Sequence, residues 1–137
     1  MTSSTTNRLR LVLRLNAVTS FAGGAIAAIA GPWVSETLGI DHVLITRAVG
    51  VGLIAFAAFV VWTSLQDDDR LLAETRLISL GDASWVAATA IVLLTGLLTT
   101  WGVVVAVAVG LAVADFGAAQ WWLRSQALRH SGAPVSA

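Results

Sequence analysis

The chain has 137 residues, of which 57% are hydrophobic and 12% charged, and its formal net charge is zero. A soluble domain carries about 25% charged residues, so this chain has too few charges to cover a globular surface. The composition predicts an integral membrane protein whose main partner is the lipid bilayer. The low charge and zero net charge argue against a soluble catalytic domain and a basic surface for nucleic acid, and the absence of Cys argues against a disulfide scaffold and a thiolate metal site.

Four apolar stretches along the chain are each long enough to cross a hydrocarbon core of about 30 Å. The longest uncharged segment, between Asp82 and Asp115, exceeds one span, and we expect it to turn at Thr99–Gly102. The predicted spans are 11–30, 44–65, 78–98 and 101–123. The sequence therefore predicts an all-α membrane protein, with residues 1–137 forming a single domain that is a bundle of four transmembrane helices joined by short loops.

The loops between the spans carry helix start and stop signals. Residues 32–38 begin with Pro32 and precede Gly39, which is typical of a short helix, and we expect it to lie on the outer interface. Asp41 is predicted to cap the second span. Residues 67–69 are all Asp and predict a solvated helix start, since acidic side chains complement the helix dipole. A weak divalent-cation site is the alternative.

The arginines predict the orientation of the chain. Cytoplasmic loops carry an excess of Lys and Arg, and with four spans the two termini and the middle loop share one side. Seven arginines fall on that side and only Arg47 falls on the other, the seven being Arg8, Arg10, Arg14, Arg70, Arg76, Arg124 and Arg129. Both termini are therefore predicted to be cytoplasmic, with the protein in a cell inner membrane.

The first span also resembles a cleavable signal peptide. It has a basic start, an apolar stretch and small residues at Ala28 and Ala30 before Gly31. Arg14 and Asn16 interrupt the apolar region, which favours a retained helix. Cleavage would leave three helices.

Few polar residues fall inside the predicted spans, and charged groups there cost about 2.5–3.5 kcal/mol each at mid-membrane. They are expected at similar depth and form one candidate intramembrane polar cluster: Arg14, Asn16, Asp82 and Asp115. We expect Arg14 to face Asp115 or Asp82, with Asn16 as a further hydrogen-bond donor. One interpretation is a structural clasp that fixes the order of the helices. The other makes Asp115 a carboxylate that carries protons or binds a ligand.

Aromatic residues suggest a second candidate site. Asp82 and Trp85 are three apart and Asp115 and Trp122 are seven apart, so each pair shares a helix face. Trp85 and Trp122 could frame a pocket at the inner leaflet for a flat ligand such as a quinone. Packing beside interfacial Trp residues is the alternative, because Trp is common at membrane interfaces.

The remaining polar residues predict no catalytic or metal site. His42 and His130 fall on opposite sides of the membrane and are expected to be solvated, and Arg47 is expected to snorkel or to pair at the outer interface. Pairs of small residues four apart, which let helices approach closely, predict a tight bundle and are compatible with a homo-oligomer. They are Ser20 with Gly24, Gly23 with Ala27, Ala48 with Gly52, and Gly110 with Ala114.

Three segments carry a family resemblance: Leu13–Ala17 with Ser20, Thr46–Gly50 with Phe56 and Ala57, and Asp82–Val86. They resemble small four-helix bacterial inner-membrane proteins of uncharacterised function, which are loosely similar in size and layout to DoxX-like proteins. Some DoxX-like proteins are linked to quinone or thiol redox membrane complexes. The Lys-free, Ala-rich and Val-rich composition is typical of a GC-rich bacterium.

Three functions are compatible with these patterns. The favoured one is a non-enzymatic membrane protein, a small subunit or modulator of a membrane complex that binds no cofactor. The alternatives are a small proton-coupled transporter that acts as an oligomer through Asp115, and a quinone-binding redox accessory protein.

Overall fold

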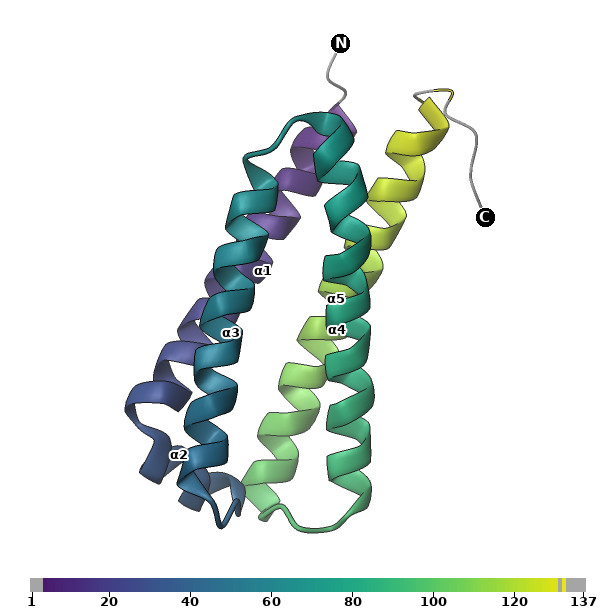
Figure 1. The fold of residues 1–137 in the computed structure, drawn as a ribbon. Helices are drawn as coiled ribbons and strands as arrows, with labels where there is room; N and C mark the ends of the chain where they lie inside the picture. The colour runs from purple at the N-terminus through teal and green to yellow at the C-terminus, as the bar shows by residue number, and fades with distance from the viewer. Residues whose placement is uncertain (1–3, 131, 133–137) are drawn as a thin grey trace.

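The computed structural model describes residues 4–130 and 132, and in them the chain forms five helices (Figure 1). These are α1 (Ser4–Ile29), α2 (Gly31–Leu38), α3 (Val43–Ser64), α4 (Asp68–Leu94) and α5 (Thr100–His130). All except α2 are long and apolar enough to cross a membrane. The described residues contain no strand. The predicted all-α bundle with four spans is confirmed, and the chain is a multi-pass membrane protein.

The helices extend beyond the apolar stretches because polar residues at their ends remain helical. α4 begins at Asp68, where the side chain of Asp67 accepts a hydrogen bond of 2.9 Å from the backbone N–H of Arg70. This N-cap confirms the predicted acidic helix start. At the other end of the molecule, α3 is preceded by His42 with no side-chain cap, so the prediction that Asp41 caps this span is wrong.

The turn between the last two spans lies earlier than predicted. It occupies residues 95–99, where Gly96 has a φ of +68°, a backbone conformation that suits glycine. Thr99 then caps α5, because its Oγ1 accepts a hydrogen bond of 2.9 Å from the backbone N–H of Gly102. The predicted turn at Thr99–Gly102 is therefore mostly the first turn of α5.

The four long helices form two hairpins. α1 packs along α3, and α4 packs along α5; α1 also packs against α5, whereas α3 and α4 contact each other much less. In Figure 1, α1 begins and α5 ends at the end of the molecule that also holds the α3–α4 loop. We call this the basic end, because the segments that meet there carry all the arginines except Arg47. α2 and the α4–α5 loop lie at the other end, which we call the distal end.

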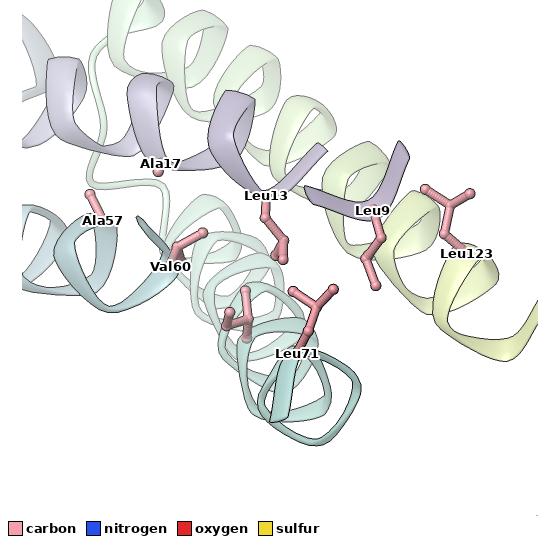
Figure 2. Packing of buried hydrophobic residues seen from close by; sticks show 8 residues of the cluster. Leu9, Leu13, Ala17, Ala57, Val60, Leu71 and Leu123 are labelled. Carbon is pink, nitrogen blue, oxygen red and sulfur yellow. The ribbon is translucent and has the colours of Figure 1, made fainter. Parts of the chain in front are cut away.

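The buried hydrophobic core lies toward the basic end and draws on all four long helices (Figure 2). Its residues are Leu9, Leu13, Ala17, Ala57, Val60, Leu71, Ile78 and Leu123. By contrast, no residue in 83–94 of α4 or in 103–119 of α5 is buried. The distal parts of these two helices therefore present most of their side chains on the surface of the bundle.

Glycine lets α1 and α3 approach closely. A Cβ atom on Gly50 would lie 2.5 Å from the backbone N of Ala28, and one on Gly24 would lie 2.7 Å from the carbonyl O of Gly50. Gly23 and Gly52 face open space, because a Cβ atom on either would meet nothing within 4 Å. Of the predicted small-residue pairs, Ser20 with Gly24 therefore lies at the contact of α1 with α3, and Gly110 with Ala114 lies toward α4, where a Cβ on Gly110 would be 3.5 Å from Cγ2 of Thr89.

Candidate functional site

Four buried polar side chains meet between α1, α4 and α5, and we call them the polar cluster: Asn16, Ser79, Asp82 and Gln120. Oδ2 of Asp82 accepts a hydrogen bond of 3.0 Å from Nδ2 of Asn16 and one of 3.1 Å from Nε2 of Gln120. The hydroxyl of Ser79 donates to Oε1 of Gln120 at 3.4 Å. The polar cluster thus joins three helices through a single carboxylate oxygen.

Neighbouring residues position the members of the polar cluster. Ser20, one turn along α1, donates a hydrogen bond of 3.2 Å to Oδ1 of Asn16, so the amide of Asn16 points its NH2 group toward Asp82. Gly117 lies on α5 opposite Asp82, and a Cβ there would be 3.5 Å from the Cβ of Asp82. This distance is an ordinary van der Waals contact, so α5 packs directly against α4 at the level of Asp82.

The structure brings together two of the four residues predicted to form the intramembrane cluster. Asn16 donates to Asp82 as expected, whereas Arg14 and Asp115 are exposed on the surface of the bundle. The only ion pair within residues 4–130 joins Arg10 and Asp68, so the predicted contact of Arg14 with Asp115 or Asp82 is wrong.

Helix rotation explains this correction. Successive residues are about 100° apart around a helix axis. Arg14 is therefore rotated by roughly 200° from Asn16, and Asp115 by roughly 140° from Gln120. Similar depth along the helices was not sufficient to place the four side chains on facing surfaces.

Gln120 and Ser79 are members of the polar cluster that the sequence patterns did not reveal. Ser79 is three residues before Asp82, a spacing that puts both on one face of α4. Gln120 is an uncharged polar residue inside the span predicted for 101–123. Its amide is the signal that could have identified it, because amides as well as charges need hydrogen-bond partners in lipid.

A groove of about 430 Å³ runs between α4 and α5 beside the polar cluster. Asp82 lines it, together with the apolar walls of both helices and the indole of Trp121. Neither Trp85 nor Trp122 lines this groove, so the predicted Trp pair is replaced by a single, different Trp. Trp121 is four residues beyond Gly117 and shares its face of α5, whereas Trp122 is exposed on another face.

Charged residues at the basic end join the helices near their termini. The guanidinium of Arg10 donates to the carbonyl O of Ser64 at 2.6 Å and to Oδ1 of Asp68 at 2.8 Å. Nε of Arg124 donates to the carbonyl O of Leu72 at 2.7 Å. Asp68 therefore forms an ion pair with Arg10. Within the described residues, no three His, Asp or Glu side chains are grouped as metal ligands would be.

At the distal end, α2 is fixed to its neighbours by polar contacts. The hydroxyls of Ser35 and Thr46 lie 2.7 Å apart in a buried hydrogen bond between α2 and α3. The side chain of Arg47 lies over Gly31, where a Cβ would be 2.7 Å from its Cγ. Arg47 makes no ion pair with the acidic residues of this end that the structure describes. His42 and His130 are both exposed, at opposite ends of the molecule.

No protein-family model matches this chain, and comparisons with curated proteins and with solved structures give no similar protein. The resemblance to DoxX-like proteins therefore stays a prediction. The polar cluster, the groove and the surface of the bundle carry the functional inference.

Proposed function

We propose that this protein is a non-enzymatic subunit or modulator of a membrane complex, and that it contacts its partner through the face of α5 that carries Asp115. The observation that supports this proposal is the position of Asp115. It is fifteen residues from Thr100 and fifteen from His130, so it lies at the middle of the helix. Its side chain is exposed on the bundle and makes no hydrogen bond or ion pair within residues 4–130.

A carboxylate in this position is costly if it faces lipid. Lipid tails offer no hydrogen-bond donor, and a charged side chain near the bilayer centre costs about 2.5–3.5 kcal/mol on insertion scales. A donor or cation on a partner helix would offset this cost. Other residues on the face of α5 that carries Asp115 are also exposed, and we call this face the stripe. They include Ala108, Leu111 at 64% and Trp122 at 54%. The stripe therefore offers a small, an aliphatic and an aromatic contact around one polar group.

In this proposal, the protein itself catalyses no reaction. The polar cluster consists of two amides, a hydroxyl and a carboxylate that are engaged with one another. The hydroxyl of Ser79 donates to the amide oxygen of Gln120 and not to the carboxylate of Asp82, so it lacks the hydrogen bond to a base that activates a serine nucleophile. We propose a structural role for the polar cluster, which fixes the relative positions of α1, α4 and α5.

Site-specific photo-crosslinking in the membranes of the native host tests the proposed contact. A benzophenone amino acid at Leu111 should give a discrete crosslinked product with a different membrane protein. The matched control is Phe21, which is 55% exposed on α1, away from the proposed face. Asp115→Leu should weaken the product from position 111. A product at twice the mass of the chain would show a homo-oligomer instead, and crosslinking to lipid alone would contradict the proposal.

The same experiment separates this function from a proton-coupled transporter. If Asp115 only joins a partner, Asp115→Asn keeps an amide that can hydrogen-bond, and both crosslinking and the deletion phenotype should be retained. If Asp115 carries a proton, Asp115→Asn should keep the crosslink and lose the phenotype, because an amide cannot exchange that proton.

We also propose that the protein lies in a bacterial inner membrane with the basic end in the cytoplasm. Seven arginines belong to the segments at this end, and positive charge favours the cytoplasmic side. Reporter fusions after Ala137 and after Arg70 should be active only for cytoplasmic reporters, and a fusion after Glu36 only for a periplasmic one. The reverse pattern at any of these positions would overturn the orientation.

A further inference from the structure

The groove between α4 and α5 combines an apolar wall with a single buried carboxylate. Its volume of about 430 Å³ lies within the range of small-molecule sites, which is roughly 300–1,000 Å³. The walls include Val86 and Val113, and Trp121 lies at the side. Trp121 is 53% exposed and Ala118 is also exposed, so the groove opens on the outer surface of the bundle, where a molecule dissolved in the membrane can reach it.

Asp82 lines this groove, and one of its two carboxylate oxygens accepts no hydrogen bond within residues 4–130. Its side chain is 3% exposed, and its Oδ2 atom accepts both hydrogen bonds from Asn16 and Gln120. No donor among residues 4–130 bonds to Oδ1. Both donors to Oδ2 are neutral amides, and the ion pair in this part of the chain lies elsewhere, between Arg10 and Asp68. The carboxylate is therefore held in place without a counter-charge.

We propose that the α4–α5 groove binds a hydrophobic organic cation. Its positive charge lies against Oδ1 of Asp82, and its apolar body lies between Val86, Val113 and Trp121. A carboxylate in surroundings of low dielectric attracts a cation more strongly than it would in water. The Trp121 indole, which also lines the groove, adds a second favourable contact, because aromatic rings attract cations. A neutral molecule of the same shape would gain only the apolar contacts.

This site is independent of the proposed partner contact. Asp115 lies on α5 five residues before Gln120, and it does not line the groove. The two carboxylates therefore provide a matched pair of variants. Both lie inside the spanning helices, but only Asp82 faces the groove.

Ligand binding in nanodiscs of zwitterionic phosphatidylcholine tests the proposal. The probe is ethidium, a planar monovalent cation whose fluorescence anisotropy reports binding, and phenanthridine is the neutral comparison. We expect saturable binding of ethidium to the wild type, a Kd raised at least tenfold by Asp82→Asn, and no change with Asp115→Asn. Phenanthridine should compete at least tenfold less effectively than a second, non-fluorescent planar cation.

A second variant keeps the test decisive if Asp82→Asn does not fold. Ala118→Phe fills the groove from its open side and leaves Asp82 and its two amide donors unchanged, so it should also raise the Kd for ethidium at least tenfold. Circular dichroism and size-exclusion chromatography verify the fold of each variant. Wild-type affinity in a folded Ala118→Phe or Asp82→Asn protein would overturn the proposal, and so would equal competition by phenanthridine.

Discussion

At the scale of single residues, Asp82 and Asp115 show how the same side chain meets two environments within one bundle. Asp82 is 3% exposed and accepts two amide hydrogen bonds, whereas Asp115 is exposed and has no bonded neighbour among residues 4–130. The carboxylate of Asp82 has donors within the chain. The carboxylate of Asp115 has none among residues 4–130, and this is the basis of the proposed partner contact.

Gln120→Leu should destabilise the protein, because it removes one of the two donors to Asp82 and the acceptor for Ser79. Hydrogen bonds between membrane helices are worth about 0.6–2 kcal/mol each, so we expect a loss of roughly 1–2 kcal/mol in the free energy of unfolding. Reversible unfolding in mixed detergent micelles, followed by circular dichroism, measures it.

Gln126→Leu is the control for this variant. Gln126 is on the same helix and half-buried, and it lies outside the polar cluster. Its replacement should change the free energy of unfolding by less than about 0.5 kcal/mol, as for most substitutions away from buried networks. Equal effects at positions 120 and 126 would contradict a stabilising role for the polar cluster.

The sequence correctly predicted that Asn16 and Asp82 lie together. It wrongly placed Arg14 and Asp115 beside them. Depth in the bilayer follows from the count of residues along a span, so similar depth is predictable. Rotation about the helix axis is not, because these spans are apolar around most of their circumference and leave no polar face as a guide. Gln120 was missed for a different reason, since an uncharged amide stands out from an apolar span less than a charge does.

At the scale of the elements, the four spans were predicted, and both ends of α3 agree within one residue, whereas the polar ends of α1, α4 and α5 lie outside the predicted spans. The apolar stretches locate all four spans, since each must be about 20 residues long to cross the bilayer. α4 starts at Asp68 and α5 continues to His130 because these ends lie beyond the apolar stretches, where capping and charge, not hydropathy, decide where a helix stops. The short α2 was predicted from Pro32 and Gly39 within one residue of its bounds.

Gly50→Ala should weaken the contact between α1 and α3. The added methyl group would lie 2.5 Å from the backbone N of Ala28, and neither backbone can yield without moving a whole helix. Overpacking of this kind costs about 1–3 kcal/mol. The loss should appear as a lower midpoint of thermal unfolding in detergent.

Gly52→Ala provides the matched control on the same helix. Nothing lies within 4 Å of the added methyl group, so no clash follows. Alanine is about 0.8–1.0 kcal/mol more favourable than glycine in a soluble helix interior, and the midpoint should stay the same or rise. If both variants were destabilised alike, the close approach at Gly50 would not be the cause.

At the scale of the whole molecule, the hydrophobic core and the polar cluster both draw on α1. Leu9, Leu13 and Ala17 of α1 lie in the core, and Asn16 belongs to the polar cluster. The first helix therefore contributes to both of the buried clusters that join the two hairpins. This packing supports, in physical terms, the expectation that the first span is a retained helix and not a signal peptide.

The mature protein should accordingly keep its amino terminus. Loss of residues 1–30 would remove Asn16 from Asp82 and open the core, so a cleaved chain would be unstable. Intact-mass spectrometry of the protein extracted from its membrane should give a mass that includes the first helix. A chain that begins at Gly31 would contradict this prediction.

The polar cluster also has a consequence for the order of events during synthesis. Asn16 and Asp82 are separated by 66 positions in the chain, so Asn16 is translated well before its acceptor. At 5–20 residues per second this interval lasts roughly 3–13 s. The glycine contact between α1 and α3 needs only residues up to Ile54, so the first hairpin can form before translation of the chain is complete. Until α4 is in place, the Oδ1 atom of Asn16 can accept from Ser20 on the same helix, but its NH2 group lacks the acceptor that Asp82 provides and is available to the insertion machinery or to a chaperone.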